Sequence, residues 1–126
     1  YTMKKGRKIT GGKYKKFAGK KKHSLPGIER KVKLRDTKQK TIRGRGGNER
    51  TVLLSEKFAN VLDPKSKKSK KVEIKNVLET PANRFLARQN IINKSAIIET
   101  ELGKAKVTNR PSQEGSIQAI LITEKK

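Results

Sequence analysis

The stretch TIRGRGGNERTVLL, from Thr41 to Leu54, separates two parts of the chain that differ in character. Before it lies an arm rich in glycine, lysine and arginine, and after it apolar and polar residues alternate to the C-terminus. Residues that adopt positive φ at low cost occupy its centre: Gly44, Gly46, Gly47 and Asn48. We therefore expect a tight turn or bulge there, entered by a strand at Thr41–Arg43 and left by one at Thr51–Leu54.

Three arginines accompany this turn, namely Arg43, Arg45 and Arg50. A guanidinium group forms bidentate, charge-assisted hydrogen bonds with phosphate. A rigid turn that carries three such groups indicates a hairpin that binds phosphate. The alternative is an ordinary solvated hairpin tip, and the rest of the chain has to decide between the two.

The charge of the chain is strongly positive and unevenly distributed. Lysine and arginine number 34 against 11 acidic residues, which gives a net charge of +23. Residues 1–50 hold 19 basic and 3 acidic side chains, a net of +16, and residues 51–126 hold 15 and 8, a net of +7. Charge of this density opposes compaction unless a polyanion neutralises it. The expected partner is a nucleic acid or an anionic membrane surface.

A membrane is the weaker of these two candidates. The longest unbroken apolar run is Ala119–Ile122, whereas a spanning helix needs about 20 apolar residues. The basic arm also lacks the apolar face of an interfacial helix. We therefore expect a nucleic-acid partner and no membrane contact.

Residues 1–28 form a basic N-terminal extension without helical or strand periodicity, interrupted by five glycines and one proline. Because it has almost nothing to bury, we expect it to be disordered without RNA. Rings interleave with lysines there, a pattern typical of arms that neutralise phosphates and stack on exposed bases. The alternative is a flexible, solubilising tail. The predicted RNA-binding residues of the arm are Lys4, Lys5, Arg7, Lys8, Lys13, Tyr14, Lys15, Lys16, Phe17, Lys20, Lys21, Lys22 and His23.

Residues 29–126 read as one mainly β domain. Short segments of alternating character are expected to be extended at 29–43, 51–55, 58–62, 72–78, 96–102, 104–108 and 116–122, with a further piece starting at 91–92. Asp63–Ser66 and Arg110–Gly115 are predicted turns, and a change of phase at Asn76–Val77 predicts a bulge. Strands this short and closely spaced favour a small antiparallel β-barrel or a tightly curled sheet. Its core is expected to draw on Val, Ile and Leu, with Phe58 and Phe85 as the aromatic residues.

One short helix of about two turns is expected from Pro81 to Arg88, with Thr80 as its N-cap. Phe85 and Leu86 would then close one end of the barrel, and Arg84 and Arg88, four residues apart, would face RNA or a neighbouring protein. The predicted RNA-binding residues outside the arm are Arg30, Arg43, Arg45, Asn48, Arg50, Arg84 and Arg88.

Motifs for catalysis or cofactor binding fail on inspection. The segment Gly6–Lys13 has the wrong spacing for a phosphate loop, and Tyr14 stands where a magnesium-binding hydroxyl would be needed. The single histidine, His23, lacks the partners for a triad or a metal site. The absence of cysteine excludes disulfides and cysteine-ligated zinc. Glu99 and Glu101 read as an exposed hairpin face. We expect no enzyme activity, no metal, no cofactor and no small-molecule substrate.

Several segments resemble the archaeal form of the ribosomal protein S8e (eS8) family: GRKITGGKYK (6–15), RGRGGNER (43–50), NVLDP (60–64) and the run from Leu78 to Ile122. The resemblance covers nearly the whole chain in order. It implies a β-barrel with a basic extension buried in small-subunit (16S) ribosomal RNA, neighbouring small-subunit proteins as further partners, a cytoplasmic location in the ribosome, and no catalysis. Lys8 departs from the serine or alanine that the family pattern suggests, which only adds charge.

Other interpretations remain open at this stage. A related barrel occurs in a eukaryotic ribosome-assembly factor, but that factor carries a long helical region before the barrel, which this chain lacks. A free-standing RNA chaperone or nucleoid protein would use the same charge without a fixed site. An enzyme acting on RNA is the third option, and it lacks a candidate acid–base pair.

Overall fold

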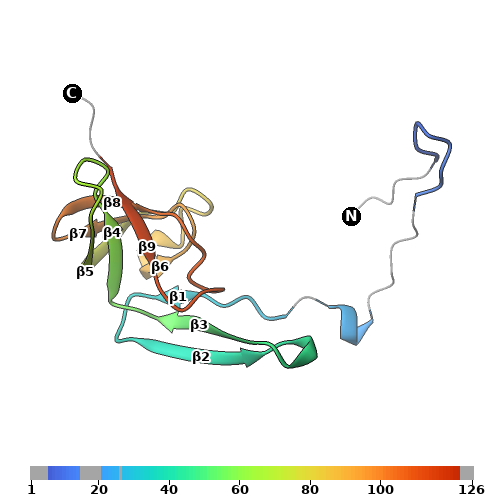
Figure 1. The fold of residues 1–126 in the computed structure, drawn as a ribbon, viewed down its shortest axis with the longest axis horizontal. Coiled ribbons are helices and arrows are strands. Elements are labelled where there is room, and N and C mark those ends of the chain that lie inside the picture. The colour runs from blue at the N-terminus through green and yellow to red at the C-terminus, as the bar shows by residue number, and fades with distance from the viewer. Residues whose placement is uncertain (1–5, 15–20, 26, 123–126) are drawn as a thin grey trace.

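The computed structural model describes residues 6–14, 21–25 and 27–122, and it is a mainly β protein. Nine strands and three short 3-10 helices follow one another in the described part of the chain (Figure 1). The strands are β1 Val32–Lys33, β2 Lys38–Arg43, β3 Glu49–Ser55, β4 Phe58–Leu62, β5 Ser69–Glu79, β6 Ile91–Ile92, β7 Ile97–Thr100, β8 Gly103–Val107 and β9 Gln118–Leu121. The 3-10 helices are η1 Lys22–Ser24, η2 Arg45–Gly47 and η3 Ala87–Gln89.

Five of the strands close into a barrel in the order β4-β5-β7-β8-β9. Consecutive members pair antiparallel, and the parallel pairing of β4 with β9 completes the circle, with Val61 opposite Ala119. The expected small barrel is thus confirmed, although its closing pair is parallel. The predicted bulge is confirmed too, because the β5–β7 register shifts between Ile74 and Asn76 and again between Val77 and Glu79.

The other four strands form a second sheet in the order β2-β3-β1-β6, which lies beside the barrel (Figure 1). Its pairs are antiparallel for β2–β3 and β1–β6 and parallel for β1–β3. Val32, Leu53 and Ile92 of this sheet belong to the same buried cluster as the barrel residues. The two sheets therefore share one hydrophobic core.

Aliphatic side chains make up this core, as the sequence predicts, but the two phenylalanines do not. Phe58 is 38% exposed and Phe85 is 62% exposed. The expectation that both are core residues is wrong. The outward position of Phe58 follows from strand alternation, since its neighbour Ala59 points inward and is buried.

The predicted helix from Pro81 to Arg88 is also wrong. Residues 81–86 form irregular turns, and only the single 3-10 turn η3 follows. The Thr80 side chain does not cap a helix; its hydroxyl donates to the Asn83 carbonyl, and the Asn83 carboxamide oxygen accepts from the Phe85 amide at 3.1 Å. These local bonds compete with helical ones, as threonine and asparagine often do.

Candidate nucleic-acid interface

The hairpin β2–β3 carries the glycine turn that the sequence predicts. Arg43 pairs with Glu49 at its end, and the Gly44 amide donates to the Asn48 carbonyl at 2.6 Å. Gly46 and Gly47 both have φ of +79°, a conformation that favours glycine, whereas Asn48 has φ of −66°. Positive φ at two sites of the turn is confirmed, and Asn48 is not one of them.

The three arginines of the hairpin do not gather on one face. Arg43 lies opposite Glu49, and Arg50 lies opposite Ile42. Because neighbouring positions of an antiparallel pair point to alternate faces, Arg43 and Arg50 occupy opposite faces of the ribbon. Arg45 lies in η2 at the tip. All three side chains are exposed, so the tip offers guanidinium groups in several directions.

The described part of the arm contains a second tight turn. Arg7 and Lys13 form an isolated antiparallel bridge, and the Lys8 amide donates to the Gly12 carbonyl at 2.8 Å. The Arg7 guanidinium donates to the Gly11 carbonyl at 3.0 Å, and the Lys8 ammonium lies 5.9 Å from the Tyr14 ring centre. This turn presents its cations to solvent, since residues 6–14 are exposed.

The base of the arm is fixed to the globular part of the protein. Arg30 is half-buried, and its Nε donates to the Ser112 carbonyl at 3.1 Å. Lys21, Lys22 and His23 lie further out, at η1, and are exposed. The predicted residues Lys4, Lys5, Lys15, Lys16, Phe17 and Lys20 lie outside the described residues.

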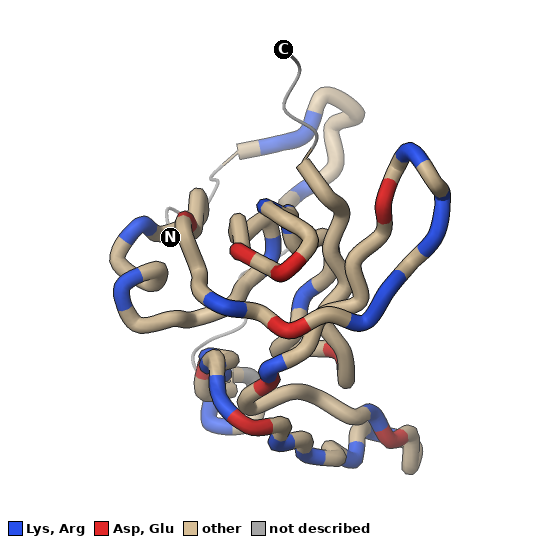
Figure 2. The backbone as a smooth tube through the Cα atoms, turned by 90° about the vertical axis from the view of Figure 1, so that its left-hand side faces the viewer, with Lys and Arg blue, Asp and Glu red and all other residues tan. Residues whose placement is uncertain are grey.

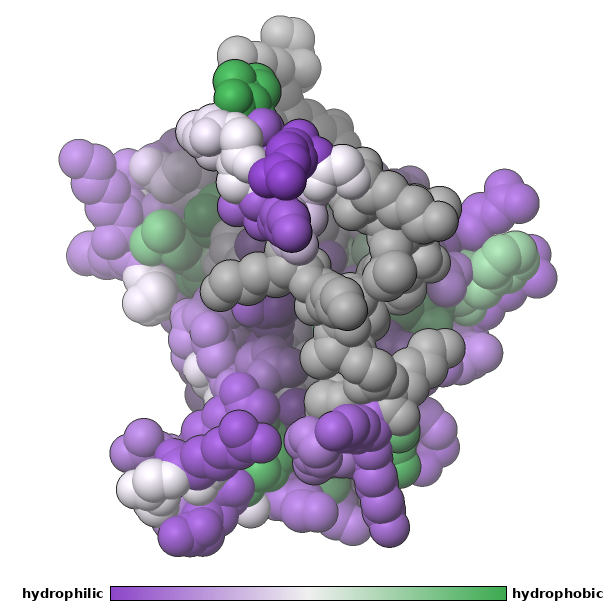
Figure 3. Space-filling view, turned by 90° about the vertical axis from the view of Figure 1, so that its right-hand side faces the viewer, coloured by the Kyte–Doolittle hydropathy of each residue, from purple (hydrophilic) through white to green (hydrophobic). Residues whose placement is uncertain are grey.

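The hairpin and the arm project from the same side of the molecule. Figure 1 shows β2–β3 extending away from the barrel in the direction taken by the chain between η1 and β1. Seen from that side, hydrophilic side chains cover most of the coloured surface, with small hydrophobic areas between them (Figure 3). The structure therefore brings two of the predicted basic segments to one side.

Arg84 and Arg88 are placed elsewhere, on the connection between β5 and β6. Both are exposed, and the Arg84 guanidinium lies 5.3 Å from the Phe85 ring centre. They are accessible to a partner, as predicted, but not as a helical i, i+4 pair, because residues 81–86 are not helical.

A lysine-rich loop was not among the predicted binding residues, although its composition is plain in the sequence. It connects β4 to β5 and carries the exposed lysines Lys65, Lys67 and Lys68, and the exposed lysines Lys70 and Lys71 follow at the start of β5. In Figure 1 this loop lies on the far side of the barrel from the hairpin tip. Lysine and arginine positions recur along the whole tube in Figure 2, so positive charge is not confined to one face.

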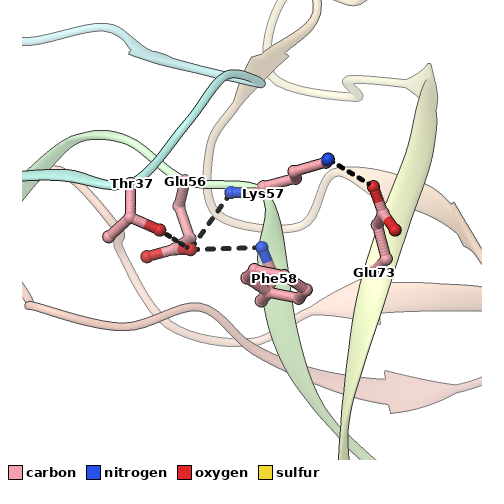
Figure 4. A network of polar contacts seen from close by, with 5 residues as sticks. All are labelled: Thr37, Glu56, Lys57, Phe58 and Glu73. Carbon is pink, nitrogen blue, oxygen red and sulfur yellow. Dashed lines mark hydrogen bonds and ion pairs between the residues drawn. The ribbon is translucent and has the colours of Figure 1, made fainter.

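A buried carboxylate at the junction of the two sheets is a feature that sequence reasoning missed. Glu56 is 7% exposed, and its Oε1 accepts from the Thr37 hydroxyl at 2.7 Å and from the amides of Lys57 and Phe58 at 3.1 and 3.2 Å (Figure 4). The Glu56 amide donates to the Lys33 carbonyl at 3.2 Å. Glu56 thus connects β1, the residue just before β2 and the start of β4. No periodic pattern distinguishes it from an ordinary surface glutamate.

An exposed ion pair lies beside this junction. The Lys57 ammonium is 2.9 Å from the Glu73 carboxylate (Figure 4). The hydrogen bond to Glu73, and then its charge, raise the pKa of Lys57 above the ordinary lysine value. Both side chains are well exposed, so this pair contributes little to stability.

In the described part of the chain, no cluster of three or more His, Cys, Asp or Glu side chains could hold a metal ion. None of the helices described there is long and apolar enough to cross a membrane.

Comparison with known proteins identifies the family. Residues 1–122 match the family described as ribosomal protein S8e. The chain belongs to the ribosomal protein S8e family. It is 51% identical to the small ribosomal subunit protein eS8 of Methanococcus aeolicus over 119 residues, which cover 94% of this chain and 93% of the relative. It is 52% identical to the eS8 protein of Sulfurisphaera tokodaii over 120 residues, with the same coverage.

A third S8e relative, the eS8 protein of Methanocorpusculum labreanum, is 45% identical over 116 residues, which cover 92% of this chain and 93% of the relative. The resemblance inferred from sequence segments is thereby confirmed over nearly the full chain. S8e is a family of ribosomal proteins.

Proposed function

We propose that this protein is a structural constituent of the small ribosomal subunit, in the cytoplasm, that binds and neutralises small-subunit ribosomal RNA. The observation that carries the proposal is the full-length similarity to small ribosomal subunit proteins eS8. The net charge of +23 supports it, because folded RNA is a polyanion that can neutralise such charge.

Within this role, the basic arm and the glycine turn are the proposed RNA-binding elements. The hairpin tip supports this assignment, since Arg43, Arg45 and Arg50 are exposed on the end of a ribbon where all residues from 43 to 51 are exposed. Guanidinium groups on both faces and at the tip suit insertion between RNA segments. A protein surface would offer such a tip fewer anionic partners.

Arg84 and Arg88 are proposed as a separate contact. They lie on another part of the surface from the hairpin, and Arg84 covers the ring of the exposed Phe85. A cation beside an exposed ring suits either an RNA base or an apolar patch of a neighbouring small-subunit protein.

The test compares the RNA binding of a variant that lacks two positive charges in the hairpin with that of a variant that lacks two positive charges in the barrel. In the double variant Arg45→Ala, Arg50→Ala, each lost phosphate contact should lower the salt slope of log K by about 0.7–0.9. The matched control is Lys75→Ala, Lys106→Ala, which removes the same charge from exposed barrel strands. Binding to a small-subunit rRNA transcript is measured across a salt series. Equal slopes in the two variants would contradict a specific role for the hairpin.

The arm is tested in the same way by replacing Lys20, Lys21 and Lys22 with alanine. Affinity for the transcript should fall and the salt dependence should flatten, since the proposed contacts are electrostatic. A loss of affinity at unchanged slope would contradict the electrostatic account. We also propose that residues 1–28 become ordered on RNA, which amide dispersion in NMR spectra with and without RNA would test.

A role in assembly, or as an unspecific RNA chaperone, makes a different prediction. A structural constituent sediments with 30S and 70S particles at close to one copy per particle. A protein that stays at the top of a sucrose gradient, or that leaves mature subunits, would contradict the proposal while leaving RNA binding intact.

A further inference from the structure

A groove beside the base of the arm is a candidate site outside the hairpin and outside most of the predicted binding residues. Its volume is about 220 Å³, below the roughly 300–1,000 Å³ typical of sites for drug-sized ligands. Four segments meet around it: the base of the arm, the connection between β5 and β6, strand β6 with the residues after it, and the loop before β9. A groove of this size suits one small planar group.

The lining of the groove combines an apolar floor with a cationic rim. Its floor holds buried aliphatic residues such as Ile91 and Ile92, and the half-buried Leu86 forms a wall. The charged lining residues are four cations and one acid: Arg30, Lys31, Lys94, Arg110 and Glu29. This excess of positive charge favours an anionic occupant, and the apolar floor favours one that also carries a flat, weakly polar part.

An unsatisfied amide lies in the same lining. The side-chain Oδ1 of Asn93 is buried and has no hydrogen-bond donor in the described structure. Buried polar atoms are nearly always paired, so an unpaired one calls for an explanation. Rotating the side-chain amide by half a turn would exchange its oxygen and nitrogen. No hydrogen bond of the oxygen would be lost, because the oxygen has none. Because this oxygen has almost no exposed surface, an occupant of the groove reaches the Asn93 amide only if the side chain turns toward it.

The groove is preformed and continuous with the arm. Strands β1 and β6 pair through Val32 and Ile92, and the Leu34 amide donates to the Asn90 carbonyl at 2.9 Å. The bond from Arg30 to the Ser112 carbonyl joins the arm to the loop before β9, and both residues line the groove. An RNA strand that follows the arm toward the barrel meets this groove where the arm joins it.

We infer that the groove binds one unpaired nucleotide of RNA, with its base against Leu86 and the Asn93 amide and its phosphates on the cationic rim. The inference rests on the proposed RNA-binding function and names a site for it. Asparagine reads base edges through paired donor and acceptor bonds. Arginine planes can stack on unpaired bases, which gives Arg30 and Arg110 a second role beside charge. A duplex does not fit, because its bases are already stacked and paired.

The test uses full-length protein labelled for NMR and two single-stranded probes of equal charge. One is an oligoadenylate of about ten nucleotides, within the range of about 4–16 nucleotides that one OB-fold barrel covers. The other is the same ribose–phosphate chain without bases. The oligoadenylate should shift the Asn93 side-chain amide and the methyl groups of Leu86 and Ile91. The abasic chain should shift the arm and the hairpin but leave those three groups in place.

Two variants separate the base contact from the phosphate contact. Asn93→Ala should bind the oligoadenylate several-fold more weakly and the abasic chain unchanged. Lys94→Ala should weaken both, and the matched control Lys106→Ala, an exposed lysine on β8, should weaken binding less. Should Asn93→Ala fail to fold, the chemical shifts of the wild-type protein still test the base contact, and the Lys94→Ala comparison still tests the phosphate contact.

The remaining outcomes would overturn the base contact, the groove site or the proposed function. Equal groove shifts from both probes would leave a phosphate-binding surface and overturn the base contact. Shifts confined to the arm and hairpin would overturn the groove site and leave the proposed function standing. A groove that no RNA perturbs, but that becomes protected from hydrogen exchange in assembled subunits, would assign it to a protein partner. The absence of binding to either probe would overturn the site and the proposed function together.

Discussion

The hairpin β2–β3 and the closed barrel differ in how far their side chains are buried. In the barrel, every second residue points into a core where Ile98, Ala105 and Val107 are almost completely buried. In the outer half of the hairpin, residues 43–51 are exposed on both faces of the ribbon. Burial stabilises the barrel, while the hairpin end is held by its own strand pairing and by two glycines with positive φ. The barrel is thus stabilised by buried side chains, whereas the hairpin end has no buried side chain and exposes its charged groups on both faces.

Strand β3 connects these regions, because its two ends belong to different environments. Glu49–Thr51 are exposed in the ribbon, whereas Val52 and Leu53 are fully buried. The Leu53 amide also donates to the carbonyls of Pro111 and Glu114 in the loop before β9. Substitutions at Glu49–Thr51 should therefore affect RNA binding, whereas substitutions at Val52 and Leu53, only a few residues further along the same strand, should affect folding.

The largest effect is expected from a deletion in the barrel core. Ile98→Ala should lower the free energy of unfolding by about 2–5 kcal/mol, because a fully buried side chain leaves a cavity. The same substitution in the hairpin, Ile42→Ala, should cost clearly less, since Ile42 is half-buried. Urea denaturation of the free protein measures both.

Phe85→Ala extends that comparison to the connection between β5 and β6. The earlier expectation of a buried Phe85 would imply a loss of about 3 kcal/mol or more. With the ring 62% exposed, the loss should stay within about 0.5 kcal/mol. A loss comparable to that of Ile98→Ala would contradict the exposed position of this ring.

The junction between the regions should be the next most sensitive point. Glu56→Ala removes the acceptor of the Thr37 hydroxyl and of two backbone amides, which should cost about 1–3 kcal/mol. Glu49→Ala is the matched control, because it removes the same charge from an exposed hairpin position. Thermal and urea melts compare the two. Equal stabilities would mean that the junction network does not hold the sheets together.

A smaller effect on stability is expected from the glycine turn, accompanied by a larger effect on assembly. Gly47→Val places a β-branched residue at φ of +79°, which should cost about 1 kcal/mol or more. The added Cβ would lie 3.9 Å from the Arg43 guanidinium, which is an ordinary contact, so the strain comes from the backbone conformation, close to a proposed phosphate ligand. Incorporation into 30S subunits, measured by quantitative mass spectrometry, should fall clearly. The melting temperature of the free protein should fall only slightly.

Gly44→Ala is the control for this turn, since Gly44 has φ of −90° and an added Cβ would meet the Asn48 carbonyl at an ordinary 3.4 Å. It should be incorporated nearly as well as the wild type. Normal incorporation of a folded Gly47→Val protein would reduce the turn to an ordinary surface hairpin.

The smallest expected effect concerns the loop between β4 and β5. The Lys65 amide and then the Ser66 hydroxyl donate to the Asp63 carboxylate and lower the pKa of Asp63. A carboxyl whose pKa is lower in the folded state stabilises above its unfolded pKa, and this contribution disappears as pH falls through the folded value. The loop should therefore loosen locally in acid, while the barrel stays folded. Amide exchange of residues 64–67 against pH measures this, and Asp63→Asn should remove the dependence.

The sequence by itself determined the elements whose signals are local. Glycines predicted the turn at 44–47, since glycine adopts positive φ at low cost, and the short apolar run at 58–62 coincides with β4. The excess of lysine and arginine indicated a polyanionic partner, because net charge needs no fold to be counted. The resemblance to the S8e family was likewise visible in the sequence alone, over nearly the whole chain.

Tertiary structure alone decided where those elements meet. The absent helix at 81–88 is the exception, because the bonds that replace it there, from Thr80 to Asn83 and from Phe85 to Asn83, are local. The parallel pairing of β4 with β9 and the grouping of β1 with β6 join segments far apart in the chain. Burial of Glu56 and the groove around Asn93 follow from such pairings. The physical reason is that long-range contacts depend on how all segments share one core, which no single stretch of sequence encodes.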